Sequence, residues 1–386
     1  MNAPITPPLN KTMLHAAHLD AGAKMGGFAG YDMPLYYDEG VKSEHLWTRS
    51  NTGLFDVSHM GQAIIKGDTA ADYFEKITPS SFRSAPLNLA RYTVLTNDQG
   101  GIIDDLIITK LAEDEFFVVF NAGCKEKDIA WMKQNLTDDL TFQELSDRSL
   151  IALQGAQAEA VLKDVLKIDT SDLGYMRIMA QGCLPCGNHV YVSRLGYTGE
   201  DGFELSIPND RALPVWNALM KNEHVKPIGL AARDSLRLDM GYPLYGHDID
   251  DSTSPIEASI GWVVQKNNAG NFFGVARILA EKQGTSFMRK RVGIKLIDKG
   301  VAREGAEIFA ASDAGNTAAS PIGILTSGGF SPSLEMSIGM GYISPDHAEI
   351  GHDIIVRVRG RELKATITAM PFVESKTKKA APAKAA

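Results

Sequence analysis

Three strand-like runs follow one another between residues 91 and 120, and they constrain the fold more than any other feature of the sequence. The runs are RYTVLT (91–96), GIIDDLIITK (101–110) and FFVVF (116–120), and only short polar turns separate them. Branched and aromatic residues bounded by polar turns are typical of strands, and short connections join antiparallel neighbours. The three runs therefore predict an antiparallel meander, and QAIIK (62–66) is a further strand candidate.

The middle run carries two adjacent carboxylates, Asp104 and Asp105, among branched apolar residues. Successive side chains of a strand point to opposite faces, so one acid faces a packed or pocket side and the other faces water or a neighbouring domain. A buried carboxylate resists ionisation unless donors or a cation compensate it, which is how functional acids are tuned. The structural alternative is that one acid caps a turn and the other forms a salt bridge, and the alternation leaves both interpretations open.

Apolar spacing and cap residues predict several helices elsewhere in the chain. Asp68 is the predicted N-cap of one helix, and Gly53 is the predicted stop of another. From 291 to 372 the chain instead shows strand patterns punctuated by glycine, which predict a small barrel or sandwich beyond a boundary near residue 285. The mixture indicates an α+β class. The helical segments are 12–23, 39–50, 68–77, 125–135, 156–166, 209–222 and 229–240.

The 386 residues are enough for two or three domains, and 44% hydrophobic with 22% charged residues is the composition of an ordinary globular protein. With 39 Lys and Arg against 47 Asp and Glu, the net charge of −8 gives no overall electrostatic case for binding nucleic acid or an anionic membrane. No run approaches the roughly 18–20 apolar residues that cross a bilayer. The first residues show neither a signal peptide nor an organelle presequence, so we expect a cytoplasmic enzyme.

Several familiar kinds of site are excluded by their missing partners. Cys183 and Cys186 form a C-x-x-C pair without the second pair or histidine cluster that zinc needs, and Cys124 stands apart, so we expect reduced thiols and no metal. Ser58 lies in VSHMG, which lacks the G-x-S-x-G elbow of a hydrolase. No Walker A or Rossmann glycine pattern occurs at a strand-to-helix junction.

Glu204 lies in GFEL, where Phe203 and Leu205 share one face of a strand and the glutamate lies on the other. It is either exposed or lines a cavity. In a cavity, a carboxylate can accept two parallel hydrogen bonds from an N–C–N edge, which pterins and guanine present. In the predicted helix 229–240, Arg233 and Arg237 lie one turn apart and suit either an anionic ligand or a structural ion-pair network.

Seven stretches keep one order along the chain: AGAKMGGFAGYDMPLYY (21–37), TGLFDVSHMGQ (52–62), GGIIDDLI (100–107), SRLGYTGEDGFEL (193–205), GLAARDSLRL (229–238), NNAGNFFG (267–274) and TSGGFSPSL (326–334). Together they resemble the aminomethyltransferase, or T protein, family of the glycine cleavage system. The likeness runs from about residue 10 to 373. Collinear motifs over nearly the whole chain are far more specific than any one of them.

The resemblance implies a three-domain, folate-binding fold around a central channel, with a C-terminal barrel. It implies residues 10–284 as a folate-binding region of two intertwined α+β domains and 285–373 as the barrel; we expect the basic, low-complexity segment 374–386 to be a disordered tail. It further implies transfer of a one-carbon unit from the aminomethyl-dihydrolipoyl H protein to tetrahydrofolate, which yields 5,10-methylenetetrahydrofolate, ammonia and the dihydrolipoyl H protein. The P and L proteins would be functional associates, and neither metal nor nucleotide would be required.

Site residues follow from matching positions. Asp105 is expected to be the catalytic carboxylate, with Asp104 more structural, and Glu204 the pterin clamp. Arg233 is the expected folate-contacting arginine. The remaining folate-pocket positions are Tyr197, Tyr92, Met60 and Asn121, with Trp262 either packing the cofactor ring or lying in the core.

One departure from the family concerns the C-terminus. Some relatives place a tyrosine or arginine that reaches the folate after the stretch that corresponds to MPFV (370–373), whereas this chain continues ESKTKKAA. Lys376 or Lys378 could substitute there by contacting the glutamate tail of the folate.

Two other classes share the fold. Folate-dependent demethylases of dimethylglycine, sarcosine or a sulfonium compound often carry a flavin domain or lose parts of GGIIDDLI, and this chain keeps the motif without a flavin signature. Folate-binding assembly factors for iron–sulfur proteins show a K-G-C-Y-x-G-Q-E type motif, which is absent here. The glycine cleavage interpretation ranks above both.

Overall fold

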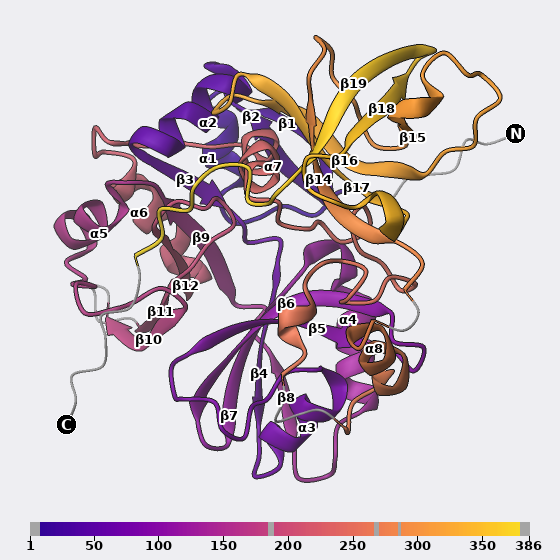
Figure 1. Ribbon diagram of the computed structural model, residues 1–386. Coiled ribbons are helices and arrows are strands. Elements are labelled where there is room, and N and C mark those ends of the chain that lie inside the picture. The colour runs from indigo at the N-terminus through magenta and orange to yellow at the C-terminus, as the bar shows by residue number, and fades with distance from the viewer. Residues whose placement is uncertain (1–7, 184–188, 266–269, 285–286, 379–386) are drawn as a thin grey trace, which may run out of the picture.

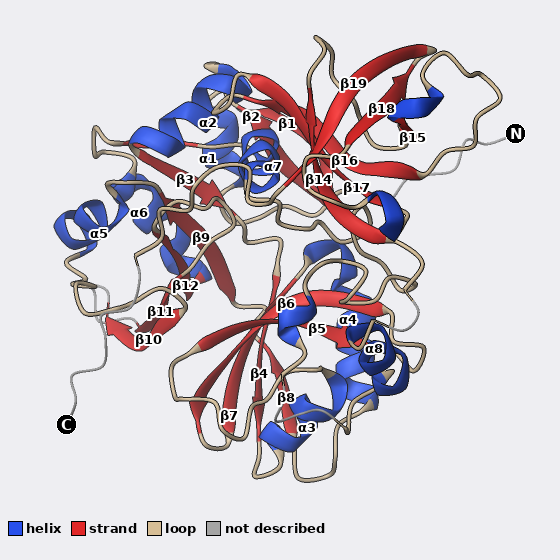
Figure 2. Cartoon of the chain, viewed as in Figure 1, coloured by secondary structure: helices blue, strands red, loops and turns tan. Residues whose placement is uncertain are grey.

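Two open sheets and one closed barrel make up the computed structural model, which describes residues 8–183, 189–265, 270–284 and 287–378 (Figure 1). Helices cover the outer faces of the sheets, and the barrel lies beside both (Figure 2). This arrangement confirms the predicted α+β class. Among the described helices, none has the length and apolar character needed to cross a membrane.

The predicted meander is confirmed in a five-stranded sheet with the order β5-β6-β7-β4-β8. Its aromatic core includes Phe74, Phe82 and Phe116, which pack in tilted and edge-on pairs about 5 to 6 Å apart beneath the covering helices. The elements are β4 (Gly61–Lys66), β5 (Ala90–Thr96), β6 (Ile102–Ala112), β7 (Glu115–Phe120) and β8 (Thr141–Glu144), with helices α3 (Ala70–Ile77), α4 (Lys125–Gln134) and α8 (Val275–Lys282).

The second sheet has six strands in the order β10-β11-β12-β9-β3-β13, and only the pair β13 and β3 is parallel. Its apolar core lies against α5 and α6, with Phe203 and Trp216 at its centre. The elements are β3 (Thr52–Asp56), β9 (Arg148–Gln154), β10 (Arg177–Cys183), β11 (His189–Arg194), β12 (Gly202–Pro208) and β13 (Val225–Pro227), with α1 (His15–Asp20), α5 (Ala158–Leu166) and α6 (Asn209–Leu219).

The two sheets meet through a core of their own. Phe117 from β7 packs on Tyr191 from β11, with ring centroids 5.0 Å apart, and Phe55, Val119 and Leu236 are buried in the same cluster. This contact fixes the five-stranded sheet relative to the six-stranded one. Helices α2 (Gly40–Ser50) and α7 (Leu230–Asp239) and the hairpin of β1 (Lys24–Phe28) and β2 (Tyr31–Tyr36) complete this region.

The C-terminal strands close into a six-stranded barrel, as the sequence predicts. Arg237 from α7 attaches the barrel to the remaining structure, because its guanidinium donates to Asp248 Oδ2 at 2.8 Å and to Ser327 Oγ of the barrel at 2.9 Å. The strands, in barrel order, are β14 (Lys290–Leu296), β17 (Met336–Ile343), β16 (Gly323–Ser331), β15 (Glu307–Ala310), β18 (Asp353–Val358) and β19 (Arg361–Thr368).

Helices form in all seven predicted segments, but two end assignments were wrong. The N-cap of α3 is Thr69 rather than Asp68, and α2 stops at Asn51, so that Gly53 already lies in β3. In Gly53 a Cβ atom would meet the side chains of Thr48 and Ile228 at 2.6 and 2.7 Å. This glycine therefore serves close packing rather than helix termination.

The predicted solvated tail from residue 374 was wrong for its described part. Lys376 N donates to Gly199 O at 2.8 Å, and Lys378 O accepts from Tyr175 N at 3.0 Å. The Lys378 ammonium also lies 3.1 Å from Glu159 Oε1. Composition suggested a free basic segment, but the backbone groups of Gly199 and Tyr175 and the carboxylate of Glu159 on α5 bind it.

Candidate functional site

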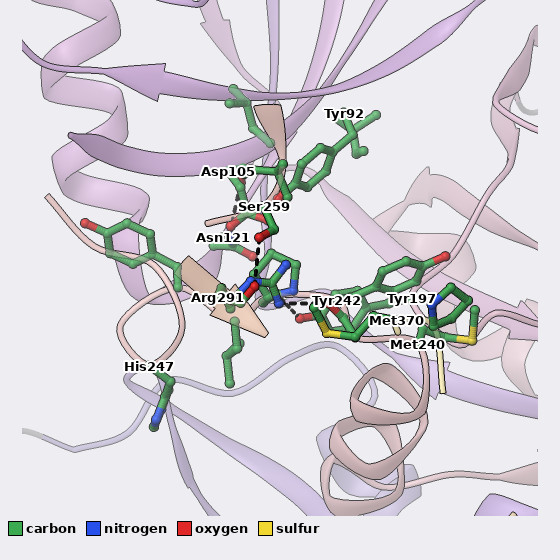
Figure 3. Close-up of a pocket in the computed structure, with 18 of the residues that line it drawn as sticks. Tyr92, Asp105, Asn121, Tyr197, Met240, Tyr242, His247, Ser259, Arg291 and Met370 are labelled. Carbon is green, nitrogen blue, oxygen red and sulfur yellow. Dashed lines mark hydrogen bonds between the residues drawn. The ribbon is translucent and has the colours of Figure 1, made fainter. Parts of the chain in front are cut away.

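A cavity of about 1220 Å³ lies where the two sheets, α7 and the barrel meet. It exceeds a typical small-molecule pocket of roughly 300 to 1000 Å³, which leaves room for a long or two-part ligand. Figure 3 shows Asp105 and Asn121 on one side, the group of Tyr197, Tyr242 and Met370 on the other, and Arg291 between them. All eight residues selected from the sequence line this cavity: Met60, Tyr92, Asp105, Asn121, Tyr197, Glu204, Arg233 and Trp262.

The paired acids of β6 both point inward, on opposite faces of the strand. Asp104 is completely buried on the packed side, whereas Asp105 faces the cavity, whose other walls come from the six-stranded sheet and the barrel. Asn121, which follows β7, joins them. Its Nδ2 donates to Asp105 Oδ1 at 2.8 Å and to Asp104 Oδ1 at 3.0 Å.

Burial gives Asp105 an unusual pKa. Removal from water, together with the charge of Asp104, raises the pKa of Asp105 to about 7. The hydrogen bond from Asn121 opposes that rise by stabilising the ionised form. A carboxyl group that titrates near neutral pH can exist in either protonation state under physiological conditions, which suits a group that must hold charge or exchange a proton.

Tyr92 and Trp262 form an aromatic wall beside Asp105. Their ring centroids lie 5.5 Å apart with an angle of 34° between the planes. Trp262 is 64% exposed and lines the cavity, so the alternative of a core tryptophan was wrong. The Tyr92 hydroxyl is buried, and its interaction with Asp105 raises the pKa of the tyrosine and opposes the rise in the pKa of the acid.

Glu204 is buried and Arg233 half-buried, and neither side chain forms an ion pair or a hydrogen bond among the described residues. Burial raises the pKa of Glu204 and lowers that of Arg233, and in both cases the charge of the other residue opposes the change. Arg233 Nη1 is buried with no hydrogen-bond partner in the described structure, and its guanidinium lies 4.9 Å from the Tyr197 ring centroid. Glu204 is therefore a cavity residue, and the alternative of solvent exposure was wrong.

The two arginines of α7 have different surroundings. Arg237 pairs with Asp248 at 2.8 Å and with Asp234 at 2.8 Å, so the structural ion-pair alternative holds for this residue. Arg233 makes no ion pair among the described residues and instead lines the cavity. One helical face thus supplies both a domain contact and a charge that is open to a ligand.

Sequence reasoning missed several cavity residues. Tyr242 stacks on Tyr197 with centroids 5.7 Å apart, and burial together with the interaction with Tyr242 raises the pKa of Tyr175. Arg291 at the start of the barrel donates to Gly241 O at 2.9 Å, and His59 lies buried with Nδ1 unpaired in the described structure. Their segments show no periodicity that marks a site, because tertiary contacts alone bring these loops to the cavity.

Other sequence candidates lie away from the cavity. Lys376 pairs with Glu200 at 3.3 Å and Lys378 with Glu159, so neither lines the cavity. Ser58 donates to Leu150 O at 3.1 Å in a structural turn. Cys124 is buried at the cavity wall, whereas the side chain of Cys183 and all of Cys186 lie outside the described residues.

The chemistry available is that of an enzyme for a planar heterocyclic ligand. Flat aromatic walls can enclose a ring, an unpaired carboxylate can accept from an N–C–N edge, and a carboxyl group of near-neutral pKa stands beside them. In the described part of the chain, no group of three or more His, Cys, Asp or Glu side chains is arranged to hold a metal ion.

Comparison with known proteins identifies the family. The model of the GCVT N-terminal domain matches residues 14–268, and that of the glycine cleavage T-protein C-terminal barrel domain matches residues 289–374. The mitochondrial aminomethyltransferase of Dictyostelium discoideum is 41% identical over 96% of this chain and 94% of its own length. The aminomethyltransferase of Bacteroides fragilis is 39% identical, covering 92% and 97% respectively.

A solved structure agrees over the whole fold. The glycine cleavage system aminomethyltransferase T from Bartonella henselae superposes with a TM-score of 0.89 at 37% identity, over 96% of this chain and 100% of that one. The chain belongs to the glycine cleavage T-protein family. The predicted fold and the predicted enzyme class, an aminomethyltransferase of the glycine cleavage system, are thereby confirmed.

Proposed function

We propose that this cavity transfers the one-carbon unit of the aminomethyl-dihydrolipoyl H protein to tetrahydrofolate, with release of ammonia and formation of 5,10-methylenetetrahydrofolate. The observation that carries the proposal is the position of Asp105, a carboxyl group with a pKa of about 7, in the cavity that also holds Glu204 and Arg233, which form no ion pair among the described residues. The cavity is large enough for a folate and the end of a lipoyl arm together.

Glu204 is the proposed clamp for the pterin. A buried carboxylate without a partner costs free energy in the empty protein, and a planar N–C–N edge that donates two parallel hydrogen bonds removes that cost. Arg233 complements it by offering its unpaired Nη1 to a carbonyl or anionic oxygen. The two residues, from β12 and α7, would fix the orientation of the ring between them.

Tyr92, Trp262 and Tyr197 supply the flat walls. Trp262 is exposed at the cavity and has room to pack on an aromatic ring, while Tyr197 is already held between Tyr242 and Arg233. Met60 and Asn121 complete the proposed folate contacts. Asn121 has the additional task of holding the Asp105 carboxylate toward the cavity.

Asp105 is the proposed catalytic residue. Positive charge develops on the one-carbon unit as ammonia leaves, and the nitrogens that attack it must lose protons. An ionised carboxylate fixed beside those atoms stabilises the cation in a site of low polarity. Its near-neutral pKa also allows Asp105 to accept a proton, and kinetic analysis across pH separates the two roles.

The partner proteins and the cellular location are proposed from the family to which the chain belongs. The partner is the lipoylated H protein, with the P and L proteins as functional associates, because the family belongs to the glycine cleavage system. A cytoplasmic location is proposed from the likeness to bacterial relatives such as that of Bacteroides fragilis, although other relatives are named mitochondrial. We also propose residues 10–284 and 285–373 as the two parts of the chain.

The decisive experiment mixes the purified chain with aminomethyl-loaded H protein and tetrahydrofolate. Ammonia and 5,10-methylenetetrahydrofolate are then measured against time. We expect ammonia release that depends on tetrahydrofolate and yields one methylene product per ammonia. Ammonia release that is unchanged when tetrahydrofolate is omitted, or no release at all, would contradict the proposal.

A further inference from the structure

Helix α4 carries a buried carboxyl group that the reaction above does not use. Asp128 is completely buried, and neither of its carboxyl oxygens has a hydrogen-bond donor among the described groups. Its carboxyl group contacts that of Asp104, which is equally buried. Two buried carboxylates in contact repel each other, so the contact is stable only when one of them carries a proton.

The hydrogen bonds indicate where that proton lies. Asp104 accepts from Asn121 N at 3.2 Å and from Asn121 Nδ2 at 3.0 Å, so its anionic form is stabilised by two donors. Asp128 has no comparable donor. Burial and the charge of Asp104 raise the pKa of Asp128 to about 11, which agrees with a protonated group that donates to Asp104.

The contact continues to the cavity through one amide. Asn121 Nδ2 donates to Asp105 Oδ1 at 2.8 Å and to Asp105 O at 3.0 Å in addition to Asp104. Asp128, Asp104, Asn121 and Asp105 therefore form a row that runs from the α4 side of β6 to its cavity side. The row fixes the orientation of the Asn121 amide, because its NH₂ group must face both carboxylates.

We propose that Asp128 is a positioning residue, whose proton keeps Asp104 anionic and thereby orients Asn121 and sets the charge state of Asp105. This inference rests on the proposed function of Asp105. The charge of Asp104 is one of the two factors that hold Asp105 near neutrality, so its loss would change the pH at which Asp105 ionises.

Among the described residues, no cation forms an ion pair with Asp104, Asp105 or Asp128. The charge of Lys127 on α4 opposes the rise in the pKa of Asp128, but its ammonium lies over the Tyr245 ring and 3.4 Å from Asp251 rather than beside the acid. The other titratable groups that act on the row are Tyr92 from β5, Tyr197, Tyr245 and the Cys124 thiol.

The proton can be observed without any turnover. Infrared difference spectroscopy on the purified full chain, with isotope-labelled aspartate at about pH 9, detects the carbonyl stretch of a protonated carboxylic acid. We expect the band in the unaltered chain and in Glu126→Gln, an exposed acid of the same helix, and its loss in Asp128→Asn. Absence of the band from the unaltered chain, or its persistence in Asp128→Asn, overturns the proposal.

The kinetic consequence separates positioning from simple stability. Asp128→Ala leaves Asp104 without its donor, so Asp104 takes up a proton. The pKa of Asp105 then falls, and the acidic limb of the plot of kcat against pH shifts to lower pH. We expect kcat itself to fall by about 10-fold or more. Asp128→Asn retains a neutral donor, so the acidic limb of the plot of kcat against pH should stay at the same pH. An equal shift in both variants, or no shift in Asp128→Ala, contradicts the inference. If the chain lacked the proposed activity, the infrared result would still locate the proton.

Discussion

Glu204 and Arg233 line the same cavity and influence each other's ionisation, yet they form no ion pair within the described structure. A direct pair would satisfy both charges and leave nothing for a ligand. Because they stand apart, each retains hydrogen-bonding capacity that a heterocycle inserted between them can use.

Glu204→Gln is expected to weaken tetrahydrofolate binding by about 10- to 100-fold, since the amide cannot accept two parallel hydrogen bonds and its own NH₂ group meets the donors of the ligand. Calorimetric titration measures the change directly. Glu144→Gln, on the exposed edge strand β8, serves as the matched control and should bind as tightly as the unaltered chain. Unchanged affinity in Glu204→Gln would remove this residue from the pterin site.

Arg233→Lys is expected to be damaging despite the retained charge. A lysine loses the planar fork and the stacking on Tyr197 that the guanidinium provides at 4.9 Å. We expect folate affinity to fall about 10-fold or more, whereas Arg303→Lys on the exposed barrel surface should have no effect. Full affinity in Arg233→Lys would mean that only net charge matters at this position.

Asp105→Asn is expected to lower turnover by about 10²- to 10⁴-fold while folate binding stays largely intact, because the charge that stabilises the transferred carbon is lost. Asp104→Asn should be milder, since Asp104 does not line the cavity and acts on Asp105 only through its charge and through Asn121. Steady-state kinetics and calorimetry on both variants test this asymmetry. Equal losses of kcat in two folded proteins would contradict the assignment of Asp105.

The same acid is expected to cost stability. The pKa of Asp105 is raised to about 7 from an ordinary value of 3.8, so between these pH values the folded state holds more protons than the unfolded state. Stability therefore falls as pH rises through this window. At about pH 8 the free energy of unfolding of Asp105→Asn should exceed that of the unaltered chain by about 1 to 3 kcal/mol, which raises its unfolding temperature. Near pH 4 the two proteins should differ little. A difference of the same size at both pH values would show that ionisation is not its cause.

Arg237→Ala is expected to destabilise the protein by about 3 to 5 kcal/mol, because it leaves the buried Asp248 without its cation and removes a contact to Ser327. Chemical denaturation measures the loss. Arg303→Ala at an exposed barrel position should stay within about 0.5 kcal/mol of the unaltered chain. A similar loss in both would argue against a structural role for the Arg237 network.

The sequence predicts elements well where local pattern decides them. The meander and the barrel follow from alternation and short turns, and β6 keeps its two acids on opposite faces as expected. The pattern could not say that the far face is also buried, because α4 covers it through tertiary packing. Asp128 was invisible for the same reason: an acid in a helix with a weak apolar face is typical of an exposed position.

The sequence likewise identified some of the cavity residues and missed others. Family motifs selected eight lining residues, but Tyr242 and Arg291 were missed because they lie in a loop and at the start of a barrel strand, where no local period marks them. The tail was misjudged because composition carries no information on backbone partners. Lys378 is held by Tyr175 N and by Glu159, both distant in sequence.

The attachment of residues 370–378 has a consequence for how the protein is made. Met370 and Pro371 line the cavity, Phe372 N donates to Asp239 O at 2.8 Å, and Lys376 N donates to Gly199 O. Domains generally fold in order during synthesis, N-terminal first. Residues 370–378 follow both sheets and the barrel in the sequence, so this part of the cavity wall is synthesised after the strands that it packs against. The cavity therefore takes its final form only after residues 370–378 have docked, however early its sheets have folded.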